Sequence, residues 1–334
     1  MQKYLKIIAD GGPLSRADMR EAMDVLLGGK ASDIEIAAFL MGLRGRGETV
    51  DELVGAAEAM RSAATPVDAG ADLVDTCGTG GDGQHTYNIS TAAAIVAAGA
   101  GVKIAKHGNR AASSSSGSSD VLSVLGVNLQ ATPDTVRKAI EVAGIGFMFA
   151  ANHHKAVAKV APVRKALGVR TIFNLLGPLS NPAGASRQLL GVFDGALVSP
   201  IAEALGELGT KRAWIVHGDD GLDELTTTTT SRVADLNGTS VQSRVVSPEE
   251  AGLPRCEPRQ LRGGSPEENA RALKDLLTGQ PGAYRDIVLL NAAATLVVAD
   301  LAPDLTEGAA LAAQSIDRGR AVTALAELIR ITNE

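Results

Sequence analysis

Cysteine is scarce in this sequence, and long apolar runs are missing from it. Only Cys77 and Cys256 occur in 334 residues, which is too few for a disulfide framework, and their spacing does not suit a metal site. There is no stretch of about 18 apolar residues, and the amphipathic N-terminus lacks the apolar region of a secretion signal. We therefore expect a protein of the reducing cytoplasm that is neither secreted nor embedded in a membrane.

Aromatic residues and net positive charge are also in short supply. Aromatics make up 3% of the sequence, so the core must be built from Ala, Val, Leu and Ile around 37 glycines. Lys and Arg number 32 against 38 Asp and Glu, a net charge of −6. This balance provides no broad positive surface for DNA or RNA, so we expect no nucleic-acid partner and only local recognition of phosphate.

The first 65 residues carry one helix signal after another. Ser15 can cap a helix that ends at Gly28-Gly29, and capping boxes begin at Ser32 and Thr49, each with a Glu three residues later. These signals predict a small all-helical domain over residues 1–65.

Residues 70–334 show a different sequence pattern. Short apolar runs, such as 102–105 and 145–150, alternate with helical stretches, which predicts an α/β domain with a mainly parallel central sheet. One antiparallel hairpin is expected at 232–246, where Asn237-Gly238 offers the positive φ angles that a tight turn requires.

The segment Asp75-Thr-Cys-Gly-Thr-Gly-Gly-Asp-Gly83 is the densest candidate site. It follows a predicted strand and precedes a helix that begins near Asn88. Glycines at such a junction let backbone amides approach an anion, and the helix N-terminus adds partial positive charge, so we expect phosphate here. A plain glycine-rich turn is the alternative. The spacing also satisfies a dinucleotide fingerprint, but Lys106 and Arg110 stand where that motif needs an acidic residue for the ribose.

Residues 106–120 predict a second phosphate-binding loop. Lys106, Asn109 and Arg110 are followed by a serine-rich stretch and by a helix that starts near Asp120. Cations, an amide and hydroxyl groups ahead of a helix start all favour phosphate. The alternative is a solvated polar loop with a good helix cap.

Four carboxylates follow a predicted strand in the segment HGDDGLDE (217–224). Adjacent carboxylates in an exposed, Gly-containing loop suit Mg²⁺, which takes few protein oxygens and leaves other positions to water and phosphate. An acidic surface turn is the alternative. With two phosphate-like loops upstream, we predict a metal ion used together with a phosphorylated substrate.

Six longer segments carry a family resemblance. They are CGTGGDG (77–83), YNIST (87–91), KHGNRAASS (106–114), GSSDVLSVLG (117–126), APVRKALGVRTIFNLLGPLSNPA (161–183) and HGDDGLDEL (217–225). Several long motifs in one order are highly specific. Over essentially its whole length, the chain resembles the anthranilate phosphoribosyltransferases of tryptophan biosynthesis.

The resemblance implies an activity and an architecture. The family joins the amino nitrogen of anthranilate to the ribose carbon of 5-phosphoribosyl diphosphate and releases pyrophosphate, with Mg²⁺ as cofactor and two ions per active site. The implied fold is a helical domain, completed by a later helical segment at about 162–183, packed on the α/β domain with the active site between them. A homodimer formed through the helical domain is also implied.

The resemblance also assigns roles to residues. Anthranilate would contact Gly78, Asn109 and Arg164, and the planar guanidinium of Arg164 would pair with the substrate carboxylate. Mg²⁺ would be held by Ser90, Asp223 and Glu224. The residues that would contact phosphoribosyl diphosphate are Gly78, Gly80, Gly81, Asp82, Thr86, Asn88, Ser90, Thr91, Lys106 and Ser118.

Several polar residues have no assigned role in the reaction. We assign no general base, because an aryl amine is already neutral and nucleophilic; His107 is a candidate for one and equally for a structural hydrogen-bonding residue. His153-His154 is expected to line a loop and not to hold a metal. Two features depart from the family pattern: Lys155 places a charge beside the expected anthranilate entrance, and the threonine run 226–230 is unusually long.

Three other functions are alternatives. A pyrimidine nucleoside phosphorylase shares this architecture but has no use for the Asp223-Glu224 pair. A nucleic-acid-binding relative needs a basic stripe, against which the net charge speaks. The other large group of phosphoribosyltransferases has an uninterrupted apolar run before its acidic pair, and His217-Gly218 breaks that run here.

Overall fold

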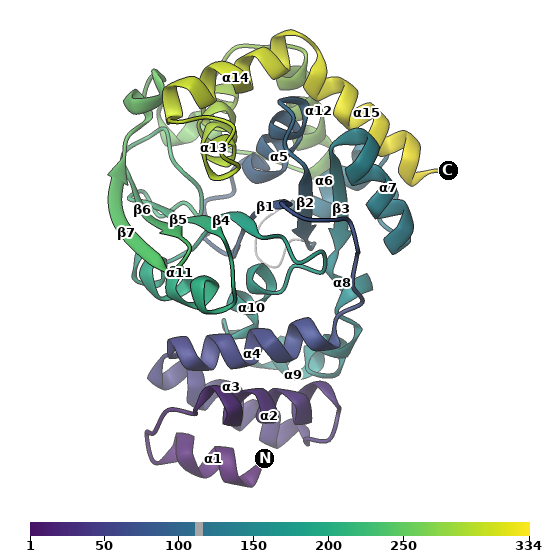
Figure 1. Ribbon diagram of the computed structural model, residues 1–334. Coiled ribbons are helices and arrows are strands. Elements are labelled where there is room, and N and C mark those ends of the chain that lie inside the picture. The colour runs from purple at the N-terminus through teal and green to yellow at the C-terminus, as the bar shows by residue number, and fades with distance from the viewer. Residues whose placement is uncertain (111–115) are drawn as a thin grey trace.

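In the computed structural model, which describes residues 1–110 and 116–334, a helical domain lies beneath an α/β domain (Figure 1). The helical domain begins with helices whose starts are set by local hydrogen bonds. The Ser15 hydroxyl accepts from the Asp18 amide, and Ser32 and Thr49 form the two expected capping boxes. These helices are α1 (Gln2–Ala9), α2 (Arg16–Leu27), α3 (Asp33–Arg46) and α4 (Val50–Ala63).

A seven-stranded sheet forms the centre of the α/β domain, in the order β3-β2-β1-β4-β5-β6-β7. The first five strands of the chain are parallel to one another, and β6 runs antiparallel to both of its neighbours, β5 and β7. The predicted fold class, a helical domain with a mainly parallel α/β domain, is confirmed. The strands are β1 (Val74–Gly78), β2 (Ile104–Gly108), β3 (Ile145–Phe149), β4 (Arg187–Gly191), β5 (Arg212–Gly218), β6 (Ser231–Asn237) and β7 (Ser240–Val246).

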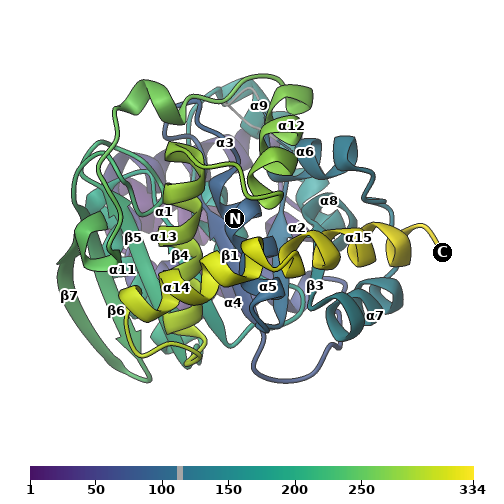
Figure 2. The ribbon, with the colours of Figure 1, turned by 90° about the horizontal axis from the view of Figure 1, so that it is seen from above.

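Both faces of the sheet are buried. Neighbouring residues on a strand point to opposite sides, so each strand contributes side chains to two separate cores. Leu189 and Trp214 belong to the core on one face, and Leu190 and Ile215 to the core on the other. The first face is covered by the helices seen from above in Figure 2. They are α5 (Ile89–Gly99), α6 (Ser118–Leu125), α7 (Pro133–Ala143), α12 (Pro266–Leu277), α13 (Ala283–Val298), α14 (Leu305–Asp317) and α15 (Arg320–Thr332).

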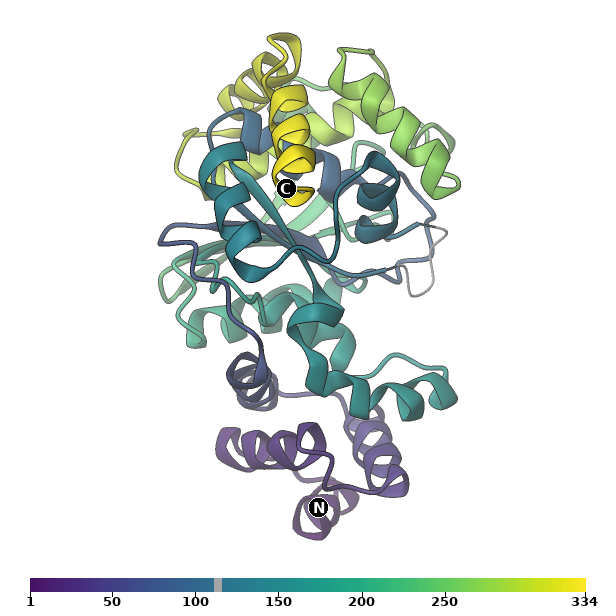
Figure 3. The same cartoon turned by 90° about the vertical axis from the view of Figure 1, so that its right-hand side faces the viewer.

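The opposite face of the sheet joins the helical domain. Its core is continuous with that domain, since Ile215 of β5, Leu176 of the helix α10 (Phe173–Leu179) and Phe39 of α3 belong to one apolar cluster. Figure 3 shows the intervening helical segment reaching from the sheet down to the N-terminal helices. The helices on this side are α8 (Ala150–His153), α9 (Ala161–Leu167), α10 (Phe173–Leu179) and α11 (Val198–Glu207).

The strand order reverses direction between β1 and β4. From β1 the chain proceeds outward to β2 and β3, then returns to the other side of β1 as β4 and proceeds to β5. Loops that leave two adjacent parallel strands in opposite directions open a crevice at the carboxyl ends of the strands, where ligands bind in open α/β sheets. The loop after β1 is the glycine-rich segment singled out from the sequence.

The hairpin between β6 and β7 is present, but its turn lies one residue further along than expected. Asn237 pairs with Ser240, so Gly238 and Thr239 form the two-residue loop. Only Gly238 has a positive φ, 61°, and Asn237 belongs to the strand. Glycine at the first loop position is typical of a type II′ turn, which needs one positive φ where a type I′ turn needs two.

None of the helices in the described residues is long and apolar enough to cross a membrane.

Candidate active site

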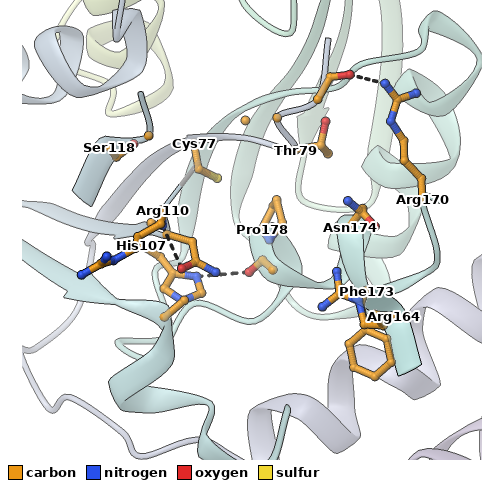
Figure 4. Close-up of a pocket in the computed structure, with 18 of the residues that line it drawn as sticks. Cys77, Thr79, His107, Arg110, Ser118, Arg164, Arg170, Phe173, Asn174 and Pro178 are labelled. Atoms are coloured by element: carbon orange, nitrogen blue, oxygen red, sulfur yellow. Dashed lines mark hydrogen bonds between the residues drawn. The ribbon is translucent and has the colours of Figure 1, made fainter. Parts of the chain in front are cut away.

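A cavity of about 950 Å³ opens at the carboxyl ends of β1 and β2, facing the α9–α10 segment (Figure 4). Among the described residues that line it, none is Asp or Glu. An unbalanced positive lining of this kind favours a ligand with several negative charges. The cationic lining residues are Lys106, Arg110, Arg164, Lys165 and Arg170.

The glycine loop, residues 79–88, forms one wall of the cavity. Gly80 and Gly81 have φ angles of 66° and 77°, a region that side chains with a Cβ rarely adopt. The strand includes Asp75 to Gly78, so the loop itself begins only at Thr79. These backbone angles let the loop make a tight turn with its main chain close to the cavity.

The acidic pair is buried, contrary to the expectation of an exposed loop. Asp223 and Glu224 are 9% and 8% exposed. Asp223 Oδ2 accepts a hydrogen bond from the Gly80 amide at 2.7 Å, and Glu224 Oε1 accepts one from the Ser90 amide at 3.1 Å. Burial, with the nearby Asp82 carboxyl second, raises the pKa of Asp223 to about 7. Burial, followed by the charge of Asp223, also raises the pKa of Glu224.

The other two carboxylates of the acidic segment do not join this pair. Asp220 accepts hydrogen bonds from the hydroxyls of Thr226 and Thr228, and Asp219 accepts from Thr230 and Arg232. The long threonine run therefore folds back on the first two aspartates and braces the loop. The four acidic residues divide into a bracing pair and a pair that faces the glycine loop, which their sequence order does not reveal.

Two glycines make room for Asp223. A Cβ on Gly78 would collide with its carboxylate, and a Cβ on Gly191 would collide with its backbone. Gly78 and Gly191 are register partners at the ends of β1 and β4, so Asp223 passes directly over the point where the strand order reverses. Gly191 was not among the predicted site residues; its position at the end of a predicted strand was the available signal.

Lys106 lines the cavity from a buried position on β2. Its side chain is 1% exposed, and Nζ donates to the Thr76 carbonyl oxygen and, at 3.4 Å, to Ser90 Oγ. Burial lowers the pKa of this lysine, and the charge of Asp75 opposes that shift. Asp75 is itself fully buried and accepts hydrogen bonds from the His107 amide and the Asn181 side chain. This network holds β2 and its cation in place beside Ser90.

The structure brings together some of the residues expected at the diphosphate and not others. Gly78, Gly80, Gly81, Ser90, Lys106 and Ser118 line the cavity. Asp82, Thr86, Asn88 and Thr91 are not among its lining residues. Asn88 occupies the N-cap position of α5 without a side-chain capping bond; its side chain donates to the Ser116 carbonyl oxygen and accepts from Asn269, and Thr91 is buried in α5. The serine-rich stretch at 111–115, expected in the second phosphate loop, lies outside the described residues.

The three residues expected at anthranilate all line the cavity. Arg164, on α9, holds its guanidinium carbon 5.1 Å from the centroid of the Phe173 ring, and burial lowers its pKa. Among the described residues it forms no ion pair. Asn109 follows β2 and accepts a hydrogen bond from the Arg110 amide, and Gly78 ends β1. In Figure 4, Arg164 and Phe173 lie across the cavity from His107 and Arg110.

His107 is a buried, neutral side chain that lines the cavity. Its Nδ1 lies 3.2 Å from the Gly177 carbonyl oxygen, so Nδ1 carries the proton. Burial, with the charges of His154 and His153 next, lowers its pKa to about 3. His153 Nδ1 lies 2.8 Å from the Thr65 carbonyl oxygen instead, and no three metal-binding side chains converge among the residues that the structure describes.

Several residues that line the cavity were not predicted from the sequence. Lys155 is exposed in a short 3₁₀ turn and is not among the cavity-lining residues, whereas Lys165 of α9 is. Arg170, Asn174 and Gly177 also line the cavity. They belong to the segment that carried the family resemblance, and their position becomes apparent only when α9 and α10 are placed against the glycine loop.

Two family models match this chain and together span most of it. One, described as the helical bundle domain of a glycosyl transferase family, matches residues 2–64. The other, described as the α/β domain of a glycosyl transferase family, matches residues 70–322. The boundary between them lies just after α4.

Named relatives are similar along their whole length. An anthranilate phosphoribosyltransferase of Parvibaculum lavamentivorans is 56% identical over 326 residues, which is 98% of this chain and 96% of the relative. One from Rhodospirillum rubrum is 55% identical over 98% of this chain and 94% of its own length.

Solved structures of similar proteins include ligand complexes. The enzyme of Thermus thermophilus superimposes with a TM-score of 0.94 at 44% identity, covering 99% of both chains. That of Saccharomyces cerevisiae in complex with PRPP and Mg has a TM-score of 0.91 at 31% identity, covering 99% of this chain and 97% of its own. The same yeast enzyme has also been solved with 4-fluoroanthranilate, with a TM-score of 0.90 at 29% identity.

Proposed function

This chain belongs to the anthranilate phosphoribosyltransferases, and from that membership we propose that it transfers the phosphoribosyl group of 5-phosphoribosyl diphosphate to the amino group of anthranilate. The products are N-(5-phosphoribosyl)anthranilate and pyrophosphate, and the reaction belongs to L-tryptophan biosynthesis. The observation that carries the proposal is the cationic cavity: a glycine loop forms one wall, and Arg164, which has no ion pair among the described residues, lies beside the Phe173 ring on the other.

The diphosphate and ribose bind along the glycine loop and the start of α5. Gly78, Gly80, Gly81 and Ser90 supply backbone and hydroxyl groups, while Lys106 and Ser118 approach from β2 and α6. Asp82, Thr86, Asn88 and Thr91 are proposed to complete this site from behind the lining. Backbone amides of the glycine loop and of the first turn of α5 can stabilise an oxyanion, and they do so without a mobile cation.

Mg²⁺ fits the buried acidic pair. Asp223 and Glu224 are two hard oxygen ligands whose charges are costly to bury without a cation, and Ser90 lies within hydrogen-bond reach of Glu224. Magnesium characteristically takes one or two carboxylates together with water and substrate phosphate. Two ions per site are proposed from the family resemblance alone. When bound, the metal supplies positive charge to the leaving pyrophosphate.

Anthranilate binds on the α9–α10 side of the cavity. Arg164 pairs with the carboxylate from α9, while Asn109 and Gly78 line the site from the ends of β2 and β1. Arg164 lies over Phe173 and has no acidic partner among the described residues. Its planar guanidinium group is therefore available to pair with an incoming carboxylate.

The reaction needs positioning and charge stabilisation more than proton transfer. The bond from ribose C1 to the diphosphate oxygen breaks with both electrons leaving on oxygen, and the amine nitrogen forms the new bond to C1. Backbone amides and Lys106 hold pyrophosphate more tightly as its charge grows, which lowers the barrier. The neutral amine attacks without prior deprotonation and releases its proton to solvent after the bond forms, so we assign no general base; the lowered pKa of His107 makes it a weak proton acceptor.

A homodimer and a cytoplasmic location complete the proposal. Helix α3 buries Ile36, Phe39 and Leu40, yet Ile34 is 82% exposed and Met41 41% exposed on its outer side. A helix that is apolar on both sides favours a second contact, so we propose dimerisation through the helical domain. Light scattering of an Ile34→Lys variant beside the wild type tests it.

Both cysteines are free thiols, which accords with a reducing compartment.

One assay tests the proposed reaction directly. The loss of anthranilate fluorescence is followed with 5-phosphoribosyl diphosphate and Mg²⁺ together and with each omitted. We expect consumption only in the complete mixture. Consumption of a pyrimidine nucleoside with inorganic phosphate, and none of anthranilate, would instead establish a nucleoside phosphorylase.

A further inference from the structure

We propose that Arg170 is a positioning residue that fixes the glycine loop for the diphosphate. The inference rests on the proposed function and adds a residue to it. Arg170 lies in the short connection between α9 and α10, lines the cavity, and extends its side chain to the glycine loop (Figure 4). There an Nη2 hydrogen is donated to the carbonyl oxygen of Gly81.

The guanidinium of Arg170 is held from a second side. Its central carbon lies 4.2 Å from the centroid of the Phe193 ring, a cation–π contact just past the end of β4. The Phe193 amide donates to Thr79 Oγ1 at 3.1 Å, and the Thr79 amide donates to the Gly191 carbonyl oxygen at 2.9 Å. The residue whose ring supports Arg170 is therefore hydrogen-bonded, through its backbone amide, to the first residue of the same loop.

Fixing this carbonyl also fixes an amide. In a planar trans peptide the C=O and the following N–H point in opposite directions, so an arginine that holds the Gly81 carbonyl oxygen directs the Asp82 amide hydrogen away from itself. Gly80 and Gly81 both have positive φ and little intrinsic preference for one orientation. An external donor removes that freedom before the substrate binds, which is how preorganisation raises affinity.

Arg170 also connects the two substrate sites. It lies six positions after Arg164 and four before Asn174, both of which line the cavity on the α9–α10 side. Its hydrogen bond is made on the opposite wall, where the diphosphate is proposed to bind. The planar guanidinium of Arg170 can stack on the Phe193 ring and donate a hydrogen bond to Gly81 at the same time, which the ammonium group of a lysine cannot do.

The test compares three variants of the full-length enzyme: Arg170→Ala, Arg170→Lys and Lys165→Ala. Lys165 is the matched control, because it is a neighbouring cation that lines the same cavity and forms no hydrogen bond to the loop among the described residues. Michaelis constants for both substrates, kcat, calorimetric binding of Mg²⁺–5-phosphoribosyl diphosphate and Tm are measured at low and high salt.

For Arg170→Ala we expect the KM and Kd for phosphoribosyl diphosphate to rise about tenfold at both salt concentrations, with the KM for anthranilate and Tm nearly unchanged. Arg170→Lys should stay within about twofold of Arg170→Ala, because charge alone does not orient the loop. Lys165→Ala should show a smaller effect that salt removes.

Three results would overturn the inference: full rescue by lysine, an equal effect of Lys165→Ala, or an equal rise in both Michaelis constants. The calorimetric arm separates this inference from the proposed function. A wild type that binds Mg²⁺–5-phosphoribosyl diphosphate but leaves anthranilate unconsumed refutes the function, while the comparison of Arg170 variants still decides the role of the residue.

Discussion

The Asp223 carboxylate accepts a hydrogen bond from the Gly80 amide at 2.7 Å, across 143 positions of sequence. Glu224 makes the equivalent contact with the Ser90 amide. The carboxylates proposed for the metal are therefore already in contact with amides proposed for the diphosphate. We expect phosphate oxygens to compete with these carboxylates for the same donors, and a metal ion would offer the carboxylates another partner.

The first prediction concerns the double variant Asp223→Asn, Glu224→Gln. Because burial raises the pKa of both carboxyls, their charges cost stability in the folded state, and neutral amides of equal size remove that cost. We expect a Tm no lower than that of the wild type. The Mg²⁺ concentration for half-maximal activity should rise at least about tenfold.

Asp220→Asn is the matched control for this prediction. It removes a carboxylate from the same loop, but one that braces Thr226 and Thr228. Its Mg²⁺ titration should match the wild type, whereas its Tm should fall. An unchanged Mg²⁺ titration in the double variant would reject the metal assignment.

The second prediction is that Gly80→Val weakens binding of phosphoribosyl diphosphate far more than binding of anthranilate. A Cβ on Gly80 meets no atom within 4 Å, so the penalty comes from its φ of 66°. A left-handed backbone costs a residue with a Cβ about 1–2 kcal/mol, and relaxation of the loop to avoid it should weaken binding about 5- to 30-fold.

Gly70→Val provides the comparison for Gly80→Val. Gly70 has a φ of 89° and open space around it, but it does not line the cavity. That variant should lose stability and retain both affinities. If calorimetry shows the two ligands equally affected by Gly80→Val, the glycine loop has only a structural role.

The third prediction is that Arg164→Ala raises the KM for anthranilate and hardly changes that for phosphoribosyl diphosphate. Loss of a hydrogen bond to a charged group costs about 1.5–3 kcal/mol. Aniline lacks the carboxylate, so it should be a poor substrate for the wild type and lose little more in the variant. Equal losses with both amines would return Arg164 to its packing role over Phe173.

The fourth prediction concerns stability at acid pH. Burial lowers the pKa of His107 to about 3 and that of His154 to about 4, from an ordinary value of 6.5. Between pH 4 and 6.5 the unfolded chain therefore binds protons that the folded chain excludes. Stability from these groups is present above pH 6.5 and falls below it, by up to about 1.4 kcal/mol per pH unit for each histidine.

Urea unfolding from pH 7 to pH 5 measures the net slope, to which the raised pKa values of Asp223 and Glu224 contribute in the opposite direction, so the histidine contribution is read from the difference between variant and wild type. His154→Gln should flatten it, because glutamine does not titrate. His85→Asn is the control: His85 is an exposed histidine, and asparagine tolerates its φ of 53°. A slope in His154→Gln equal to that of the wild type would show that His154 does not contribute to it.

The local order of residues was enough to predict the helices and most strands. Ser15, Ser32 and Thr49 satisfy amides only three positions away, so their signals need no information from the rest of the chain. The β6–β7 hairpin was predictable for the same reason, although its exact turn depended on the pairing of Asn237 with Ser240. The glycine loop was recognisable because its conformation demands glycine at particular positions.

The chemistry of the acidic loop was decided by tertiary structure. Asp220 and Asp223 are the same residue type three positions apart, yet one braces a threonine run and the other is buried against the glycine loop. What separates them is the space that Gly78 and Gly191 leave at the ends of β1 and β4. The contact of Arg170 with Gly81 likewise exists only because α9 and α10 pack across the cavity. Contacts between residues more than 80 positions apart depend on how strands and helices pack, and no local pattern encodes that packing.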